Sequence, residues 1–229
     1  PFQIALMAVA AAISAGNCVI LKPSHHAQES EQLLAAIIQE AFPPEQVAVV
    51  TGGNEIHHSL LSQKYDFIFY TGGATAGKKV MEAAARNLTP VCLELGGKNP
   101  CIVDGTADID SAAKRIMWGK LINSGQNCLA PDYVLVQEDK HQELMEKMCM
   151  YMNEFYGDNP VAEDSGLSSI INERHFFRLL NLANGNNPAN GTVVTPNPAG
   201  ASYNREAIKI KPILLDSPEL DAPVMQDEI

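Results

Sequence analysis

Aromatic residues make up only 6% of the 229-residue chain, and basic residues are scarce: 16 Lys and Arg stand against 27 Asp and Glu. The formal net charge of -11 argues against electrostatic capture of nucleic acid or of an anionic membrane surface. We therefore expect no nucleic-acid partner. The hydrophobic share of 46% is ordinary for a globular protein with a sizeable core.

Cysteine is sparse as well, with five residues and no C-x-x-C pair. An odd number without that spacing argues against a disulfide framework and against a structural zinc site, so we predict no metal. A reducing intracellular compartment is expected. The start of the chain lacks the basic region of a signal peptide, and the apolar run at 4–13 is too short to span a bilayer.

Both ends of the chain look interrupted. The first residue is Pro1 rather than Met, helical periodicity begins at once, and residues 224–229 end without a closing element. We expect the chain to be a fragment of a longer protein.

The first part of the chain alternates between apolar runs and amphipathic stretches. Strands are predicted at 18–21, 47–50, 67–70 and 91–95, and helices at 2–15, 28–41, 54–63 and 75–87. Apolar strands separated by helices indicate an α/β fold with a parallel, Rossmann-like sheet covered by helices.

The pattern changes after Gly96 and Gly97. Strands are predicted at 100–103, 133–137, 192–195 and 209–215, and helices at 110–122, 141–156 and 173–183. We predict a domain boundary there, with a cofactor-binding domain at 1–96 and a second α/β domain at 97–229.

A turn rich in small residues, Y-T-G-G-A-T-A-G at 70–77, joins a predicted strand to a predicted helix. Such a turn exposes the first N–H groups of the helix, which suit a phosphate. The match to G-x-G-x-x-G is imperfect, since Ala74 takes the place of the middle glycine. An ordinary tight turn between strand and helix remains the alternative.

Glu94 stands between two leucines at the end of a predicted buried strand. Burial raises the pKa of a carboxyl group and makes it a candidate general base. Its place about 20 residues after the glycine turn also fits a ribose-binding acid. A solvated residue at a strand end is the third interpretation, and the local sequence does not choose among them.

Cys128 follows a predicted helix in a polar loop, N-S-G-Q-N-C, where a reactive thiol is accessible. The other four cysteines fit small buried side chains; they are Cys18, Cys92, Cys101 and Cys149. Position therefore favours Cys128 as the nucleophile, with a structural role as the alternative.

Lys22 ends a predicted strand, from which its amine can reach a ligand above the sheet. A solvated lysine is the plainer interpretation. Two pairs of adjacent histidines, at 25–26 and 57–58, suggest metal ligands, but we expect adjacent side chains on one element to point apart.

Together these segments resemble the aldehyde dehydrogenase superfamily, most closely its class 3 and fatty-aldehyde branch. The matching stretches are A-G-N-C-V-I-L-K-P-S at 15–24, Y-T-G at 70–72, E-L-G-G-K at 94–98, W-G-K at 118–120, G-Q-N-C at 125–128, A-P-D-Y at 130–133 and P-V-M-Q-D-E-I at 223–229. The combination of E-L-G-G-K with G-Q-x-C about 30 residues later is very specific.

The resemblance implies the aldehyde dehydrogenase fold and the oxidation of aldehydes to acids with NAD or NADP. It makes Cys128 the nucleophile, whose backbone N–H supplies half of an oxyanion hole, and Glu94 the base that activates the hydrolytic water. Cofactor contacts fall on Lys22, Ser24, His25, Thr71, Gly72, Gly73, Gly77, Leu95, Gly96 and Glu228. Lys22 would hold the adenosine ribose and Glu228 the nicotinamide ribose.

Four departures from the family pattern modify this expectation. The asparagine of the oxyanion hole would precede Pro1, and the chain stops just before the family's Phe-Gly-Pro, so we expect this polypeptide alone to be inactive. Many relatives have glutamate where this chain has His25, and glutamate repels a 2′-phosphate. We therefore expect NADP to be used as well as NAD. Gly73 replaces a polar residue that often contacts the pyrophosphate.

Other functions on the same scaffold are a CoA-acylating or phosphate-dependent semialdehyde dehydrogenase, which needs no water-activating Glu94, and a catalytically silent nucleotide-binding relative. A thiol redox role lacks a resolving cysteine near Cys128. By analogy we expect a homodimer, a medium or long aliphatic or an aromatic aldehyde as substrate, and a cytoplasmic location. Attachment to the cytosolic side of a membrane would need an anchor outside this sequence.

Overall fold

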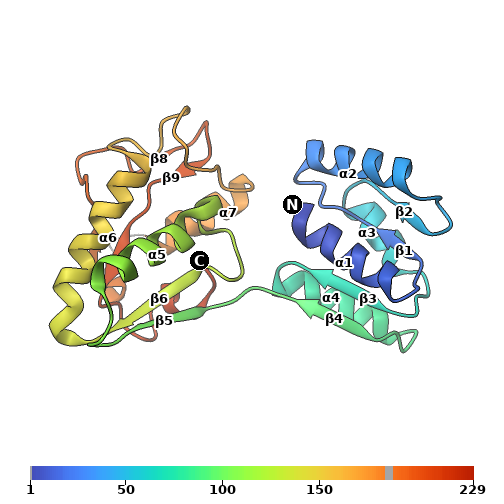
Figure 1. Ribbon diagram of the computed structural model, residues 1–229, viewed down its shortest axis with the longest axis horizontal. Helices are drawn as coiled ribbons and strands as arrows, with labels where there is room; N and C mark the ends of the chain where they lie inside the picture. The colour runs from blue at the N-terminus through green and yellow to red at the C-terminus, as the bar shows by residue number, and fades with distance from the viewer. Residues whose placement is uncertain (1, 184–187) are drawn as a thin grey trace. The chain divides into compact units, whose positions relative to one another are not determined.

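A computed structural model of the protein describes residues 2–183 and 188–229. The chain folds as two compact units, Pro1–Leu95 and Gly96–Ile229 (Figure 1). Within the described residues, no helix is long and apolar enough to cross a membrane.

The first unit alternates strand and helix as the sequence predicts. Its helices are α1 (Phe2–Ser14), α2 (Gln28–Ala41), α3 (Asn54–Leu61) and α4 (Ala74–Ala85), and its strands are β1 (Val19–Leu21), β2 (Val47–Val49), β3 (Ile68–Thr71) and β4 (Val91–Glu94). β1 pairs with β2 and β3 with β4, both in parallel. Parallel pairs joined through helices confirm the predicted α/β class.

Helices cover both strand pairs of the first unit. Val9 of α1 and Ile38 of α2 bury themselves against Val47 of β2. α4 packs on β3 and β4 and buries Val80 and Ala84, which lie one helical turn apart on the same face. The carboxyl ends of the strands, where parallel sheets bind ligands, are thereby held in place.

The second unit is built around two long helices. Its strands are β5 (Asn99–Val103), β6 (Pro131–Val136), β7 (Thr192–Val194), β8 (Tyr203–Asn204), β9 (Lys209–Ile210) and β10 (Leu214–Asp216). Its helices are α5 (Ile109–Leu121), α6 (His141–Tyr156), α7 (Glu173–Leu182) and α8 (Pro223–Gln226), with 3-10 turns η1 (Ile122–Gly125), η2 (Glu138–Lys140) and η3 (Pro188–Asn190). β5 and β6 pair in parallel, whereas β7 with β10 and β8 with β9 form antiparallel pairs.

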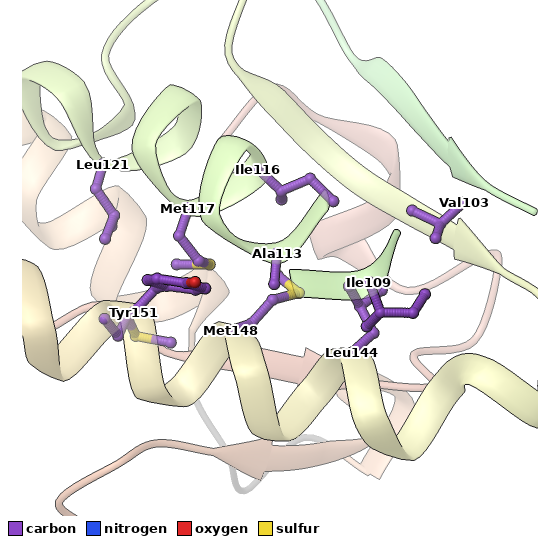
Figure 2. Packing of buried hydrophobic residues seen from close by; sticks show 10 residues of the cluster. Val103, Ile109, Ala113, Ile116, Met117, Leu121, Leu144, Met148 and Tyr151 are labelled. Carbon is purple, nitrogen blue, oxygen red and sulfur yellow. The ribbon is translucent and has the colours of Figure 1, made fainter. Parts of the chain in front are cut away.

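Side chains of α5 and α6 interlock in the core of this unit (Figure 2). Ala113 of α5 is fully buried, and its small side chain leaves room for Leu144 and Met148 of α6. The same helix pair carries a polar link, in which the Tyr151 hydroxyl donates to Asp110 over 2.7 Å. α5 is therefore firmly placed, and with it the loop that follows.

Two expectations about structure are wrong. The strand predicted at 209–215 is two short strands with different partners, because Pro212 between them has no N–H to donate to a ladder. Cys18 is exposed, since it precedes β1 in a turn after Gly16; Cys92, Cys101 and Cys149 are half-buried.

Candidate active site

The glycine turn leads from β3 into α4 without a side-chain cap. Gly73 is the N-cap residue, and a Cβ added there would meet no atom within 4 Å. The first N–H groups of this 12-residue helix have no side-chain cap, which fits a phosphate group. Thr71 ends β3, and the Gly72 N–H donates to the Glu94 carbonyl over 3.0 Å, which ties the turn to β4.

Gly77 of α4 and the side chain of Leu95 pack against each other near this turn. A Cβ at Gly77 would lie 2.6 Å from Leu95 Cδ2, so the glycine lets the leucine side chain pack directly on α4. Both are expected cofactor residues, and their contact lies within the first unit.

Lys22 directly follows β1, and its Nζ donates to the Pro23 carbonyl over 2.9 Å. Burial lowers the pKa of Lys22, and the nearby Glu31 carboxylate opposes that shift. Ser24 Oγ accepts a hydrogen bond of 3.4 Å from the His26 N–H. Burial also lowers the pKa of His25, with His26 and Lys22 adding to the effect.

The His25 and His26 rings lie 4.2 Å apart, centroid to centroid. The expectation that adjacent histidines point apart is wrong for this pair, because the two residues lie in a turn before α2 rather than on a strand. Among the described residues, no three His, Cys, Asp or Glu side chains come together as metal ligands could.

Glu94 is the last residue of β4, and its side chain is exposed. The Cys92 thiol donates to Glu94 Oε1 over 3.8 Å. Of the three interpretations of Glu94, the buried carboxyl is wrong, because β4 ends at Glu94 and the side chain is exposed there. A base role for Glu94 depends on the family pattern and not on burial.

Cys128 lies in a loop with an unusual backbone. Asn123 and Ser124 have φ of 53° and 55°, and Gly125 follows with φ of 77°. Residues other than glycine rarely adopt the left-handed region, so surrounding contacts must hold it. The Gln126 amide supplies two of them, donating to the Ser169 carbonyl over 3.0 Å and accepting from the Ile171 N–H over 2.8 Å.

The backbone of Cys128 is also held by a side chain of β5. Asn99 Nδ2 donates to the Cys128 carbonyl over 2.7 Å and to the Ala130 carbonyl over 3.0 Å. A Cβ at Gly97 would lie 2.7 Å from the same Cys128 oxygen. The thiol is half-buried in a loop that is held by hydrogen bonds of the Gln126 and Asn99 side chains. Such a loop suits a nucleophile that must meet a carbonyl in one orientation.

Glu228 lies next to Gly96, the first residue of the segment 96–99. A Cβ at Gly96 would lie 1.8 Å from Glu228 Oε2, so a side chain there would displace the carboxylate from this position. Arg178 Nη1 donates to the Glu228 carbonyl over 2.8 Å. Residues 96–99 thus contact both Glu228 and the Cys128 loop within the second unit.

A buried charged cluster beside this segment was not assigned a role from the sequence. Lys98 pairs with Asp132, whose side chain is only 3% exposed, and also donates to the Val224 carbonyl over 2.8 Å. Burial lowers the pKa of Lys120, and Asp132 opposes that shift. All three residues stand in the quoted motifs E-L-G-G-K, W-G-K and A-P-D-Y, which are the signal that could have identified them.

A cavity of about 990 Å³ opens elsewhere in the second unit, and Lys120, Asp132 and Ser124 contribute to its lining. Its wall is mostly apolar, and half of the lining residues come from β6, α6 and the segment 210–218. Cys128 does not line it. Glu94 belongs to the first unit, and Cys128 and Glu228 belong to the second.

The whole chain, residues 1–229, matches the family model for the aldehyde dehydrogenase family. The chain belongs to the aldehyde dehydrogenase family. It is 40% identical over all 229 residues to a 4,4'-diapolycopene-4,4'-dial dehydrogenase of Cytobacillus firmus and to the "Aldehyde dehydrogenase, dimeric NADP-preferring" of Mus musculus. In both comparisons the matched region covers 100% of this chain and 48% of the relative.

Solved structures of the family share the fold. A substrate-bound Staphylococcus aureus AldH superposes with a TM-score of 0.87 at 38% identity, covering 100% of this chain and 48% of that one. Aldehyde dehydrogenase C of Pseudomonas syringae, solved with NAD+ and octanal, gives 0.84 at 28% identity, covering 96% and 46%. The expected aldehyde dehydrogenase fold and the resemblance to class 3 are confirmed, and the chain spans about half the length of these relatives.

Proposed function

We propose that the protein oxidises aldehydes to carboxylic acids with NAD or NADP. The observation that supports this most is the family match over the whole chain, together with a cysteine loop held rigidly in the second unit. We further propose that residues 1–96 bind the cofactor and that residues 97–229 carry the nucleophile.

In this proposal, the Cys128 thiolate attacks the carbonyl carbon, and the backbone N–H of Cys128 donates to the oxygen that becomes negative. A bound nicotinamide would accept the hydride that leaves the resulting thiohemiacetal. The product of that step is a thioester on Cys128. Glu94 then takes a proton from the water that hydrolyses this thioester, releasing the acid and the free thiol.

The cofactor would be held by the residues that the family pattern selects. Lys22, Ser24 and His25 would lie at the adenosine ribose, Thr71, Gly72, Gly73 and Gly77 at the pyrophosphate turn, and Leu95, Gly96 and Glu228 at the nicotinamide end. The uncapped start of α4 and the open space at Gly73 support this assignment. Because His25 replaces a glutamate common in the family, we propose use of NADP as well as NAD.

The decisive experiment measures NAD(P)H formation from hexanal by the purified protein at its full natural length. The Cys128→Ala variant should lose turnover, because no thiohemiacetal forms. Glu94→Gln should release one equivalent of NAD(P)H in a burst and then stall, because the thioester persists. The half-buried Cys149, on α6, provides the matched control: Cys149→Ala should keep wild-type turnover.

Activity that survives in Cys128→Ala would rule out the nucleophile. A wild-type protein that binds NAD+ yet oxidises no aldehyde would favour the catalytically silent alternative. If acyl transfer to CoA or phosphate outpaced hydrolysis and Glu94→Gln had no effect, the protein would be a semialdehyde dehydrogenase of the acylating type.

For the whole protein we propose a homodimer, since a relative carries the name "dimeric". We also propose that the protein works in a reducing intracellular compartment. Light scattering of the purified protein checks the first proposal, and a single subunit mass would contradict it.

A further inference from the structure

The turn that leads from α5 to Cys128 has a conformation that its own residues do not favour. Asn123 and Ser124 both lie in the left-handed region, with φ of 53° and 55° and ψ of 33° and 34°. Two consecutive residues other than glycine rarely adopt it, because the Cβ atom comes too close to the following carbonyl oxygen. Contacts from outside the turn must therefore hold it, and one is the hydrogen bond from the Ser124 hydroxyl to the Ser168 carbonyl.

The half-buried side chain of Gln126 makes the other contacts to the segment 168–171, which lies more than 40 positions away along the chain. Its amide nitrogen donates to the Ser169 carbonyl and to the Asn123 carbonyl, over 3.0 Å in each case. Its amide oxygen accepts from the Ile171 N–H over 2.8 Å. Because an amide both donates and accepts, this one side chain joins the left-handed turn to the main chain of a distant segment.

The segment 168–171 is itself anchored. Ile170 is buried, and its N–H donates to the Ile208 carbonyl over 2.8 Å. The Ser169 hydroxyl donates to the Ala207 carbonyl over 2.7 Å. Both acceptors lie just before β9, so the segment that supports the cysteine loop is connected to the rest of the second unit.

The main-chain N–H of Cys128 differs from those around it. Within the segment 126–130 the other N–H groups all donate to acceptors of the same loop, namely those of Gln126, Asn127, Leu129 and Ala130. Among the described residues, none accepts from the Cys128 N–H. The loop therefore leaves this N–H available to a ligand.

We propose that Gln126 is a positioning residue, which uses the segment 168–171 as a support to hold the left-handed turn and thereby orients the Cys128 N–H toward the carbonyl oxygen under attack. The inference rests on the proposed function, since it assumes that Cys128 attacks an aldehyde. Gln126 itself does not touch the reacting atoms. The direction of the oxyanion donor depends on it, whereas the presence of the thiol does not.

The experiment measures the single-turnover rate of NAD(P)H formation from hexanal by the full-length protein. Gln126→Met keeps the length of the side chain but removes the amide. The rate should fall by about 10- to 100-fold, because a small displacement of an oxyanion donor is costly at the reacting centre. The affinity for NAD+, measured by calorimetry, should stay within about 2-fold of the wild type.

Alkylation of Cys128 by iodoacetamide separates positioning from a general loss of folded protein. This reaction develops no oxyanion, so the oxyanion donor does not assist it. Its rate in Gln126→Met, followed by mass spectrometry of the Cys128 peptide, should stay within about 3-fold of the wild type. An alkylation rate that changes as much as the turnover rate would mean that Gln126 only maintains the fold, and would overturn the inference.

Two further variants complete the test. Gln126→Glu can still accept from the Ile171 N–H but cannot donate to the Ser169 carbonyl, so its rate should fall by about 3- to 30-fold. It also provides the measurement if Gln126→Met does not fold. Asn172→Ala is the matched control, because it removes the hydrogen bond of 3.0 Å that caps α7 at the His175 N–H and leaves Gln126 intact. This variant should have a lower melting temperature but a turnover rate within about 2-fold of the wild type.

The outcomes separate this inference from the function beneath it. A wild type that oxidises hexanal together with unchanged turnover in both Gln126 variants overturns the inference alone. An equal loss of turnover in Asn172→Ala also overturns it, because loosening the neighbouring helix would then be sufficient. A wild-type protein that oxidises no aldehyde overturns the proposed function and the inference with it.

Discussion

At the scale of single residues, Gly96 gives the sharpest steric test of the candidate site. A methyl group there would overlap Glu228 Oε2, 1.8 Å from the added Cβ. In Gly96→Ala the carboxylate must move, and with it the proposed contact to the nicotinamide ribose. We expect kcat/KM for NAD+ to fall by about 10-fold, or about 1.4 kcal/mol.

The matched control is Gly166→Ala in the same unit, where the nearest atom to the added Cβ is Tyr156 Cε1 at 3.9 Å. That is ordinary contact, so steady-state kinetics of this variant should match wild type. Kinetics of Gly96→Ala within about 2-fold of wild type would mean that the position of Glu228 does not limit cofactor use.

The sequence shows which reactive side chains are present more clearly than what surrounds them. It predicts that Cys128 lies in a polar loop after a helix, and the half-buried Cys128 does lie in such a loop. The left-handed Asn123 and Ser124 were not predictable, because they depend on Gln126 contacting residues 169 and 171, more than 40 positions away along the chain. The same limit applies to Glu94, whose leucine neighbours suggested burial but whose strand ends at the surface.

At the scale of elements, amphipathic spacing predicted the long helices well. α2 and α6 have the expected bounds, because each buries one face and begins or ends at polar residues or Gly157. The prediction of one strand over 209–215 failed because Pro212, which has no N–H for a ladder, divides the segment, and its two halves pair with different partners, β8 and β7. Pairings between distant segments are not encoded in local periodicity.

The contact between α5 and α6 has a predictable pH dependence. The hydrogen bond to Asp110 and then burial raise the pKa of Tyr151 to about 12. An ordinary tyrosine in the unfolded chain titrates near pH 10. A folded pKa above the unfolded value contributes stability that is fully present below pH 10 and is lost as pH rises toward 12.

Tyr151→Phe removes this titration, while Asp110 keeps its ion pair of 2.8 Å with Lys147. We expect the urea midpoint of the wild type to fall more steeply from pH 10 upward than that of the variant. Tyr203→Phe, at an exposed tyrosine, is the control and should follow the wild type. Parallel curves for wild type and Tyr151→Phe would show that the hydroxyl does not couple these helices.

At the scale of the whole molecule, the proposed chemistry is shared between the two compact units: Lys22, the glycine turn and Glu94 belong to the first, and Cys128, Gly96 and Glu228 belong to the second. The boundary expected near residue 96 from the change in pattern lies close to the junction of the units at 95 and 96. The assignment of cofactor binding to one unit and of the nucleophile to the other stays a prediction. It implies that the two functions can be impaired separately.

A crossed pair of variants tests that separation. Lys22→Met should weaken NAD+ binding by at least about 10-fold, because a hydrogen bond from a charged group contributes about 1.5–3 kcal/mol. The same variant should leave the rate at which iodoacetamide alkylates Cys128 unchanged, since Lys22 belongs to the other unit.

Conversely, Cys128→Ala should bind NAD+ as the wild type does. Calorimetry measures the affinity and mass spectrometry of the Cys128 peptide measures the alkylation, because exposed Cys18 also reacts. Slower alkylation of Cys128 in Lys22→Met would show that cofactor binding and thiol reactivity are not divided between the units.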